Sequence, residues 1–287
     1  SDSDISNINS FIANFVEEFT ARYHMFYRRV GMDRFYLFTD YTVLEQLMES
    51  KFSVIDKFRE EAKNRELPIT LSMGFSYGDG EHDDTNAIQC AIMAAPKNSR
   101  VLVPEGVYKI SSIFLKDDLT LELAKGAVLS AFTEREKFPI LPGQIETYDE
   151  TDYYNLGTWE GNPLDMFSAI VCGINCSNVT ITGEGTIDGC TTHDNWWKNC
   201  KVRNTAWRPR LFFINHCSNV TMHGITVQNS PSWTIHPYFS NHIKFIDVKI
   251  LNPANSHNTD GLDPESCKDV LVLGTYISCL LYTSPSP

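Results

Sequence analysis

Residues 176–183 read Cys-Ser-Asn-Val-Thr-Ile-Thr-Gly, and this pattern predicts the fold of most of the chain. It places a short polar turn before an apolar alternation that ends on glycine, and a second copy begins Cys-Ser-Asn-Val at 217–220. Alternation with a period of two predicts a strand in which Val179 and Ile181 face inward while the two threonines face outward.

The first inward residue of this frame recurs at four positions, Val179, Val220, Ile243 and Val270. Their separations are 41, 23 and 27 residues. Repeats of about 20 to 50 residues predict stacked coils, in which each unit buries its inward face only against its neighbours. Few two-residue hairpin signals join the strands, which favours parallel stacking over a β-sandwich. From Gly78 onward we therefore expect a mainly β fold, a right-handed parallel β-helix.

Two segments interrupt the coil pattern. Asp-Asp-Thr at 83–85 predicts the start of a short helix over 86–95, before the first coils. The 41-residue step after Val179 predicts a long loop at about 190–210, which contains Trp196 and Trp197.

Composition narrows the class of protein. The chain has 287 residues, 42% hydrophobic and 21% charged, as in globular proteins and unlike disordered or fibrous ones. Its formal net charge is −12 with no basic tract, so we expect no nucleic-acid partner. No apolar run reaches the ~18–20 residues that span a bilayer, so we expect no membrane span. The first residues lack the basic and apolar regions of a signal peptide, and the compartment stays open.

The eight cysteines all lie beyond residue 76, and none forms a Cys-x-x-Cys pair. This spacing excludes zinc-ribbon and thioredoxin-type sites, and we expect no metal. A chain of this length does not need a disulfide framework, so we expect free, buried thiols.

The N-terminal part of the chain follows a different, α/β pattern. Apolar spacing predicts helices near 8–19 and 42–65, and β-rich runs predict strands near 24–30, 34–38 and 69–75. This order is typical of a fragment of an α+β sandwich.

Gly-Met-Asp-Arg-Phe at 31–35 resembles the Gly-Gly-Asp-Glu-Phe hairpin of GGDEF domains, and Leu-Ser-Met-Gly-Phe at 71–75 resembles a later strand of that family. The resemblance is closest to the degenerate GGDEF module of cyclic-dinucleotide phosphodiesterases. Met32 and Arg34 stand where the family has a glycine and an acidic residue, which implies no cyclase activity. We expect residues 1–77 to be an inert α+β fragment, with a signalling module as the alternative.

Residues 78–278 resemble glycoside hydrolase family 28, the polygalacturonase family. The most specific stretches are Ile-Thr-Gly-Glu-Gly-Thr-Ile-Asp-Gly at 181–189, Asn-Ser-Pro-Ser-Trp-Thr-Ile-His-Pro at 229–237 and Asn-Thr-Asp-Gly-Leu-Asp at 258–263. The resemblance implies hydrolysis of galacturonan with inversion, a pectic polysaccharide or oligogalacturonide as substrate, and no cofactor.

Inverting hydrolysis needs an acid that protonates the leaving oxygen and an opposing carboxylate that activates water, with the carboxyls about 6.5–9.5 Å apart. By resemblance, Asp260 is the water-activating base, and Asn258 orients its neighbours and binds substrate. Asp263 either binds substrate or braces the turn. The alternative is a purely structural Asn-Thr-Asp turn, whose side chains form hydrogen bonds with the backbone only.

Trp233 and His236 lie one coil before Asp260 and are expected to reach the same groove. Trp233 would stack on a sugar ring, and His236 would hydrogen-bond a hydroxyl or a carboxylate. A half-buried aromatic and a satisfied histidine fit the sequence equally well. Arg210, with Arg208, is expected to meet a uronate carboxylate, and a solvated loop role is the alternative.

The sequence lacks the Asp-Asp pair, the Gly-His-Gly and the Arg-x-Lys that follow in family 28. In register with residues 274–278, the Asp pair is expected near Leu281 and Tyr282. We therefore expect 78–278 to be the N-terminal part of a β-helix whose later coils are missing, and 279–287 to be a non-native tail. Without the general acid, little or no hydrolase activity is expected.

The segment that resembles a GGDEF domain meets the segment that resembles family 28 near residues 77 and 78. This change of family within one chain predicts a chimeric, truncated gene model. An open last coil predicts self-association through exposed strand edges. The alternative to a hydrolase is a non-catalytic, carbohydrate-binding β-helix. A pectate lyase is disfavoured because the sequence has no evident acidic calcium cluster.

Overall fold

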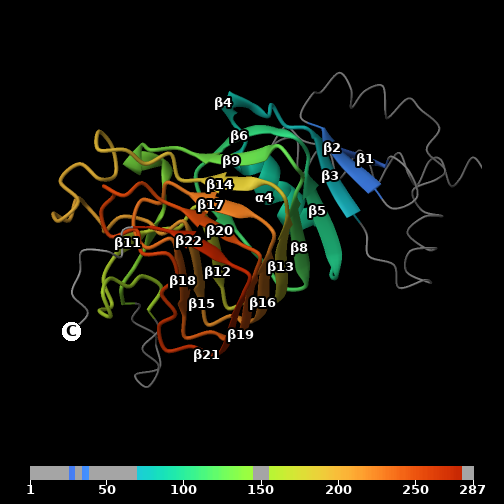
Figure 1. Cartoon of the computed structure of the whole chain (residues 1–287). Helices are drawn as coiled ribbons and strands as arrows, with labels where there is room; N and C mark the ends of the chain where they lie inside the picture. Colours follow the sequence, from blue (N-terminus) through green and yellow to red (C-terminus); the bar gives the residue numbers. More distant parts are fainter. Residues whose placement is uncertain (1–25, 30–33, 39–69, 145–154, 280–287) are drawn as a thin grey trace, which may run out of the picture.

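The computed structural model describes residues 26–29, 34–38, 70–144 and 155–279. Apart from one two-stranded sheet, the strands of the described residues form three sheets that lie side by side around one axis, and successive coils are stacked along that axis (Figure 1). Each coil of the chain passes from the nine-stranded sheet to the seven-stranded sheet and then to the side of the four-stranded sheet. This is the parallel β-helix that the repeated frame predicts.

The order of the nine-stranded sheet is β1 (Phe26–Arg29), β2 (Arg34–Phe38), β3 (Thr70–Phe75), β5 (Ser99–Val103), β8 (Leu119–Leu123), β13 (Ser177–Gly183), β16 (Ser218–His223), β19 (Asn241–Ile246) and β21 (Lys268–Leu273). The seven-stranded sheet contains β22 (Tyr276–Ser278), β20 (Lys249–Leu251), β17 (Thr226–Gln228), β14 (Thr186–Asp188), β9 (Ala127–Ala131), β6 (Gly106–Ile110) and β4 (Asp79–Asp83). The four-stranded sheet contains β18 (Ile235–Tyr238), β15 (Phe212–Asn215), β12 (Val171–Ile174) and β7 (Ile113–Phe114). A short antiparallel pair joins β10 (Ile140–Leu141) to β11 (Met166–Phe167), and η1 (Arg135–Lys137) precedes it.

The register of the nine-stranded sheet confirms the repeated frame. Val179 pairs with Val220, Val220 with Ile243, and Ile243 with Val270, all in parallel. Within β13, Val179 and Ile181 are buried in the coil interior, while the two threonines are partly exposed. The predicted alternation is therefore correct, and the apolar core runs through the middle of the coils.

Residues with left-handed backbone conformation lie at the start of the long strands. Asp118, Asn178 and Asn219 have φ of 55°, 57° and 52°, in a region that asparagine and aspartate tolerate better than most side chains. Their side chains make a ladder from coil to coil, because Asn219 donates to Asn178 over 2.8 Å and Asn178 donates to Asp118 over 2.8 Å. The polar turn is thus stabilised by its stacked copies.

Helix α4 (Thr85–Ala94) covers the first coils, and Ile88 and Ile92 join the core. The helix is where the sequence predicts it, and at its start Oδ1 of Asp83 accepts a hydrogen bond from the backbone N–H of Thr85 over 3.1 Å. The carboxylate of Asp84 instead accepts hydrogen bonds from the backbone N–H groups of Tyr77 (2.9 Å) and Gly78 (3.0 Å). Asp84 therefore links the first residues of the β-helix to the start of α4.

The predicted N-terminal strands are present as β1, β2 and β3. β1 pairs antiparallel with β2, β2 pairs parallel with β3, and β3 pairs parallel with β5 of the β-helix. The predicted helices near 8–19 and 42–65 lie outside the described residues. Within the described part, no helix is both long and apolar enough for a membrane span.

Apolar side chains of the last described coil are exposed. Val272 is 45% and Ile277 44% accessible, although their partners one coil below, Phe245 and Ile250, are buried in the coil interior. Self-association through this surface stays a prediction.

Candidate active site

Three residues from consecutive coils share one column at the entrance to the four-stranded sheet. The backbone N–H of Phe212 donates to Thr234 O over 2.9 Å, and that of Thr234 donates to Asp260 O over 2.8 Å. Arg210 lies two residues before β15, and Trp233 lies two residues before β18. When the parallel register is extended to these positions, Arg210 stands opposite Trp233, and Trp233 stands opposite Asp260. The structure thus brings together three of the residues that the sequence analysis names.

Arg210 is the most buried member of the column, at 1% exposure. Its guanidinium carbon lies 4.5 Å from the ring centre of Trp159 and 4.7 Å from that of Trp233, within the range of cation–π contact for both rings. Nη1 also donates to Ser232 Oγ over 2.8 Å. Burial lowers the pKa of Arg210 to about 9, and the nearby carboxylates Asp263 and Glu265 oppose this shift.

His236 lies beneath this group with no exposed surface. Nδ1 accepts a hydrogen bond from Arg210 Nε over 3.2 Å, and Nε2 lies 3.1 Å from Glu265 Oε2. Because Nδ1 is an acceptor, the ring proton is on Nε2 and is donated to Glu265. Burial lowers the pKa of His236 to about 4, which agrees with a neutral ring more than with a charged pair.

The expected contacts of His236 and Arg210 with substrate do not fit this arrangement, because both side chains are covered by protein. The segment after residue 155 lies over the outer face of the four-stranded sheet, where Asn155 Nδ2 donates to Tyr238 Oη over 2.9 Å. Trp159 belongs to the same segment. His236 and Arg210 are therefore buried side chains that pack against Trp233 and support it.

The two aspartates of the Asn-Thr-Asp-Gly-Leu-Asp stretch are partly buried. Burial raises the pKa of Asp260, while the positive charge of Arg210 lowers it. Burial and the charge of Asp260 raise the pKa of Asp263 to about 7, against the opposing effect of Arg210. Oδ2 of Asp263 is buried and has no hydrogen-bond partner among the described residues.

Asn258 adopts a left-handed turn, with φ of 54°, and is exposed. Its Oδ1 accepts a hydrogen bond from Arg208 Nη2 over 2.9 Å. Arg208 is 3% exposed, and its Nη1 donates to the carbonyls of Pro231 (2.6 Å) and His257 (2.8 Å). The solvated loop role for Arg208 is therefore wrong, since this side chain ties two successive turns together.

Sequence reasoning did not name Trp159 or Glu265. Glu265 stands two residues after Asp263, on the same outward parity, and that alternation was the available signal. Trp159 lies in a segment with no repeat, so its position over Arg210 depends on tertiary packing alone.

The family comparison agrees with this geometry. Residues 97–279 match the model of glycosyl hydrolases family 28. The chain belongs to this family. Residues 1–95 match the GGDEF domain of cyclic-di-AMP phosphodiesterases of the GdpP-like type. The predicted combination of two family segments in one chain is confirmed.

Curated relatives point the same way. A probable polygalacturonase of Vitis vinifera is 31% identical over 209 residues, covering 70% of this chain and 40% of the relative. An endo-polygalacturonase of Pectobacterium parmentieri is 28% identical over 203 residues, covering 66% of this chain and 47% of the relative. The chain therefore spans less than half the length of these two relatives. The cyclic-di-AMP phosphodiesterase PdeA of Listeria monocytogenes is 28% identical over 76 residues, covering 26% of this chain and 12% of that protein.

Among solved structures, an exopolygalacturonase of Thermotoga maritima superposes with a TM-score of 0.59 at 25% identity. The match covers 71% of this chain and 50% of that structure.

Proposed function

We propose that residues 78–278 are part of a polygalacturonase-type glycosidase that hydrolyses galacturonan with inversion, and that Asp260 is its water-activating base. The observation that carries the proposal is the place of Asp260, which stands directly above Trp233 and Arg210 in a column of family 28 coils. The polygalacturonase names of the relatives support galacturonan as the substrate.

The local electrostatics suit a general base. A base works best when its pKa lies near the working pH, and burial moves the pKa of Asp260 upward in that direction. The positive charge of Arg210 opposes this rise in the pKa of Asp260. In this scheme Asp260 removes a proton from a water that attacks the anomeric carbon from the face opposite the leaving oxygen.

Trp233 and Asn258 are the proposed substrate contacts. Trp233 is partly exposed and is held in place by the guanidinium of Arg210 on one side of its ring. Asn258 uses its carbonyl oxygen for Arg208, so among the described contacts its amide nitrogen is left to donate to a sugar hydroxyl. Asp263 is proposed as a neighbour that binds substrate or braces the turn.

We also propose that the 287-residue chain has little hydrolase activity by itself. Inversion needs a general acid opposite the base, and we assign no described residue to that role. Binding without turnover is accordingly the expected behaviour, which overlaps with that of a carbohydrate-binding β-helix.

The decisive experiment compares the wild type, Asp260→Asn and Asp269→Asn on polygalacturonate and on neutral galactan. Asp269 is exposed on β21 and serves as the matched control. We expect retarded migration in gels that contain polygalacturonate but not galactan. Any slow release of reducing ends should vanish in Asp260→Asn and persist in Asp269→Asn. Binding by Asp260→Asn should be retained or tightened, because a negative charge beside an anionic polymer is removed.

Equal retardation by both polymers would contradict the galacturonan assignment. Reducing-end release that is unchanged in Asp260→Asn would contradict the role of Asp260 as base.

We propose that the two family segments meet near residues 77 and 78. The ties from Asp84 to Tyr77 and Gly78, together with the burial of α4 in the coil core, support a β-helix that starts there. Sequencing of genomic DNA across the codons for residues 75–82 tests the join. A break in the native reading frame is expected, and one continuous native frame would contradict a chimera.

A further inference from the structure

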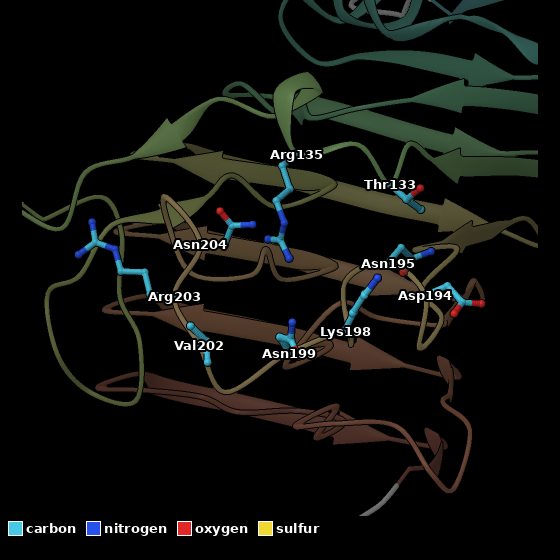
Figure 2. A pocket seen from close by; sticks show the side chains of 9 residues that line it. All are labelled: Thr133, Arg135, Asp194, Asn195, Lys198, Asn199, Val202, Arg203 and Asn204. Atoms are coloured by element: carbon cyan, nitrogen blue, oxygen red, sulfur yellow. The ribbon is translucent and has the colours of Figure 1, made fainter.

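A polar cavity of about 590 Å³ lies beside the long loop between β14 and β15 (Figure 2). Its size is within the range of small-molecule sites. The residues that line it are Thr133, Arg135, Asp194, Asn195, Lys198, Asn199, Val202, Arg203 and Asn204. None of the residues assigned above to the candidate active site is among them.

The cavity carries an excess of positive charge on a chain whose net charge is −12. Arg135 and Lys198 reach into the same space from opposite sides (Figure 2). Arg203 is already neutralised by Asp165, at 2.9 Å. Within the described ranges, neither Arg135 nor Lys198 forms a salt bridge, so these two cations are available to an anionic ligand.

The walls of the cavity are held by packing. The guanidinium of Arg135 stacks 4.5 Å from the ring centre of Trp196, which is 1% exposed and packs edge-on against Phe138 and Phe167. Asn195 is fixed as well, since its Oδ1 accepts from Thr192 N over 2.8 Å. A site with fixed walls loses little entropy when a ligand binds.

The same loop reaches the candidate active site. The ring of His193 lies 5.3 Å from that of His257, which directly precedes Asn258. Trp197 Nε1 donates to Ser230 O over 3.2 Å, in the turn that leads to Trp233. The loop that lines the cavity therefore also contacts the turns that precede Asn258 and Trp233.

The cavity and the candidate active site both lie in connections that lead from the seven-stranded sheet toward the four-stranded sheet. The cavity is built by the connections that follow β9 and β14, while Trp233 and Asp260 follow β17 and β20. Adjacent coils are about 4.8 Å apart, so an extended polymer along the axis passes both.

We propose that this cavity is a remote subsite that binds the carboxylate of a uronate residue away from the bond at Asp260. The inference rests on the proposed function, because it takes an anionic polysaccharide as the ligand. Arg135 and Lys198 pair with the carboxylate, the guanidinium as a planar two-pronged donor and the ammonium as a point charge. Asn199 and Thr133 supply partners for hydroxyl groups.

The test measures binding of oligogalacturonates from the dimer to the hexamer by calorimetry, with neutral galacto-oligosaccharides and inorganic phosphate as further ligands. The variants are Lys198→Met, Arg135→Met and, as the matched control, Lys201→Met. Lys201 is exposed on the same loop but does not line the cavity. Circular dichroism checks that Arg135→Met, which loses its stack on Trp196, is folded. Lys198→Met, whose side chain is exposed, gives the result that does not depend on folding.

Lys198→Met should weaken binding of the hexamer about tenfold, as expected for the loss of one charge-assisted contact, and leave the dimer unchanged. Lys201→Met should match the wild type. The proposal is overturned if Lys198→Met and Lys201→Met behave alike, if dimer and hexamer lose equally, if phosphate binds as tightly as the hexamer, or if no oligogalacturonate binds.

The two proposals fail separately. A length-dependent effect of Lys198→Met, together with reducing-end release that Asp260→Asn leaves unchanged, keeps the subsite and removes Asp260 as the base. Asp260-dependent turnover with no effect of Lys198→Met on any oligomer does the reverse.

Discussion

Arg210 donates a hydrogen bond from Nε to Nδ1 of His236 over 3.2 Å, inside a part of the molecule that excludes water. This one contact fixes the tautomer of the histidine and directs its other nitrogen to Glu265. It also places the positive charge of the guanidinium near Asp260 and Asp263, where it opposes the burial effect on the pKa of both. The buried Arg210 therefore lowers the pKa of both carboxyl groups against the effect of burial.

Arg210→Met should lower the free energy of unfolding by roughly 2–4 kcal/mol, because it leaves His236 and Ser232 without their buried partner. Arg203→Met is the matched control, since its exposed pair with Asp165 contributes at most about 1 kcal/mol. Urea denaturation followed by circular dichroism measures both. Equal stability of the two variants would contradict a structural role for the Arg210 contacts.

His236 should stay neutral well below pH 6. Its pKa is lowered to about 4, so the unfolded chain takes up a proton first as pH falls, and the folded state loses stability between about pH 6.5 and pH 4. Nitrogen-15 NMR of the labelled imidazole should show protonated Nε2 and bare Nδ1 at pH 6. A charged ring at that pH would mean that the pair with Glu265 outweighs burial.

Asp263→Asn should change how stability depends on pH. The pKa of Asp263 is raised to about 7, so its protonated form is favoured by folding, and this contribution is lost as pH rises from about 4 through 7. Because the side chain is partly exposed, solvent weakens this effect. We expect the free energy of unfolding of the wild type to fall by roughly 2 kcal/mol over this range relative to the variant. The variant lacks this slope. Parallel curves for the two proteins from urea melts at pH 4 to 8 would contradict the raised pKa.

Four of the eight thiols should resist modification in the folded protein. Cys90, Cys172, Cys176 and Cys217 are buried, and burial raises the pKa of Cys90 to about 12. Titration with Ellman's reagent should label the remaining four quickly and the buried four only in denaturant. Cys176 and Cys217 lie with their sulfur atoms 3.4 Å apart as free thiols. A disulfide between them, found by mass spectrometry of the fresh protein, would contradict the free-thiol state.

Much of the fold was predictable because its repeats carry their own register. The recurrence from Val179 to Val270 predicted parallel coils, and the structure pairs those residues one above another. The site was less predictable. Asp260 and Trp233 share a column because the coil spacing determines it, but the burial of His236 depends on a cover from the segment around Trp159. Such a cover has no periodic signal, so local patterns could not separate a substrate ligand from a supporting residue.

The helix start shows the same limit on a smaller scale. Asp84 belongs to the predicted helix start at 83–85 and stands at the capping position, yet its carboxylate accepts hydrogen bonds from the backbone N–H groups of Tyr77 and Gly78. A side chain with two sets of backbone donors in reach binds the set that the tertiary structure brings closest. The spacing of residues in the sequence does not reveal which set that is.

Hydrogen exchange with mass spectrometry, with and without hexagalacturonate, tests the central claim most directly. If the groove above Arg210 binds galacturonan, peptides that cover residues 229–238 and 256–265 should exchange more slowly with the sugar, while peptides of β1 and β2 should not change. Protection confined to other faces of the coil, or no protection at a saturating concentration, would contradict the account.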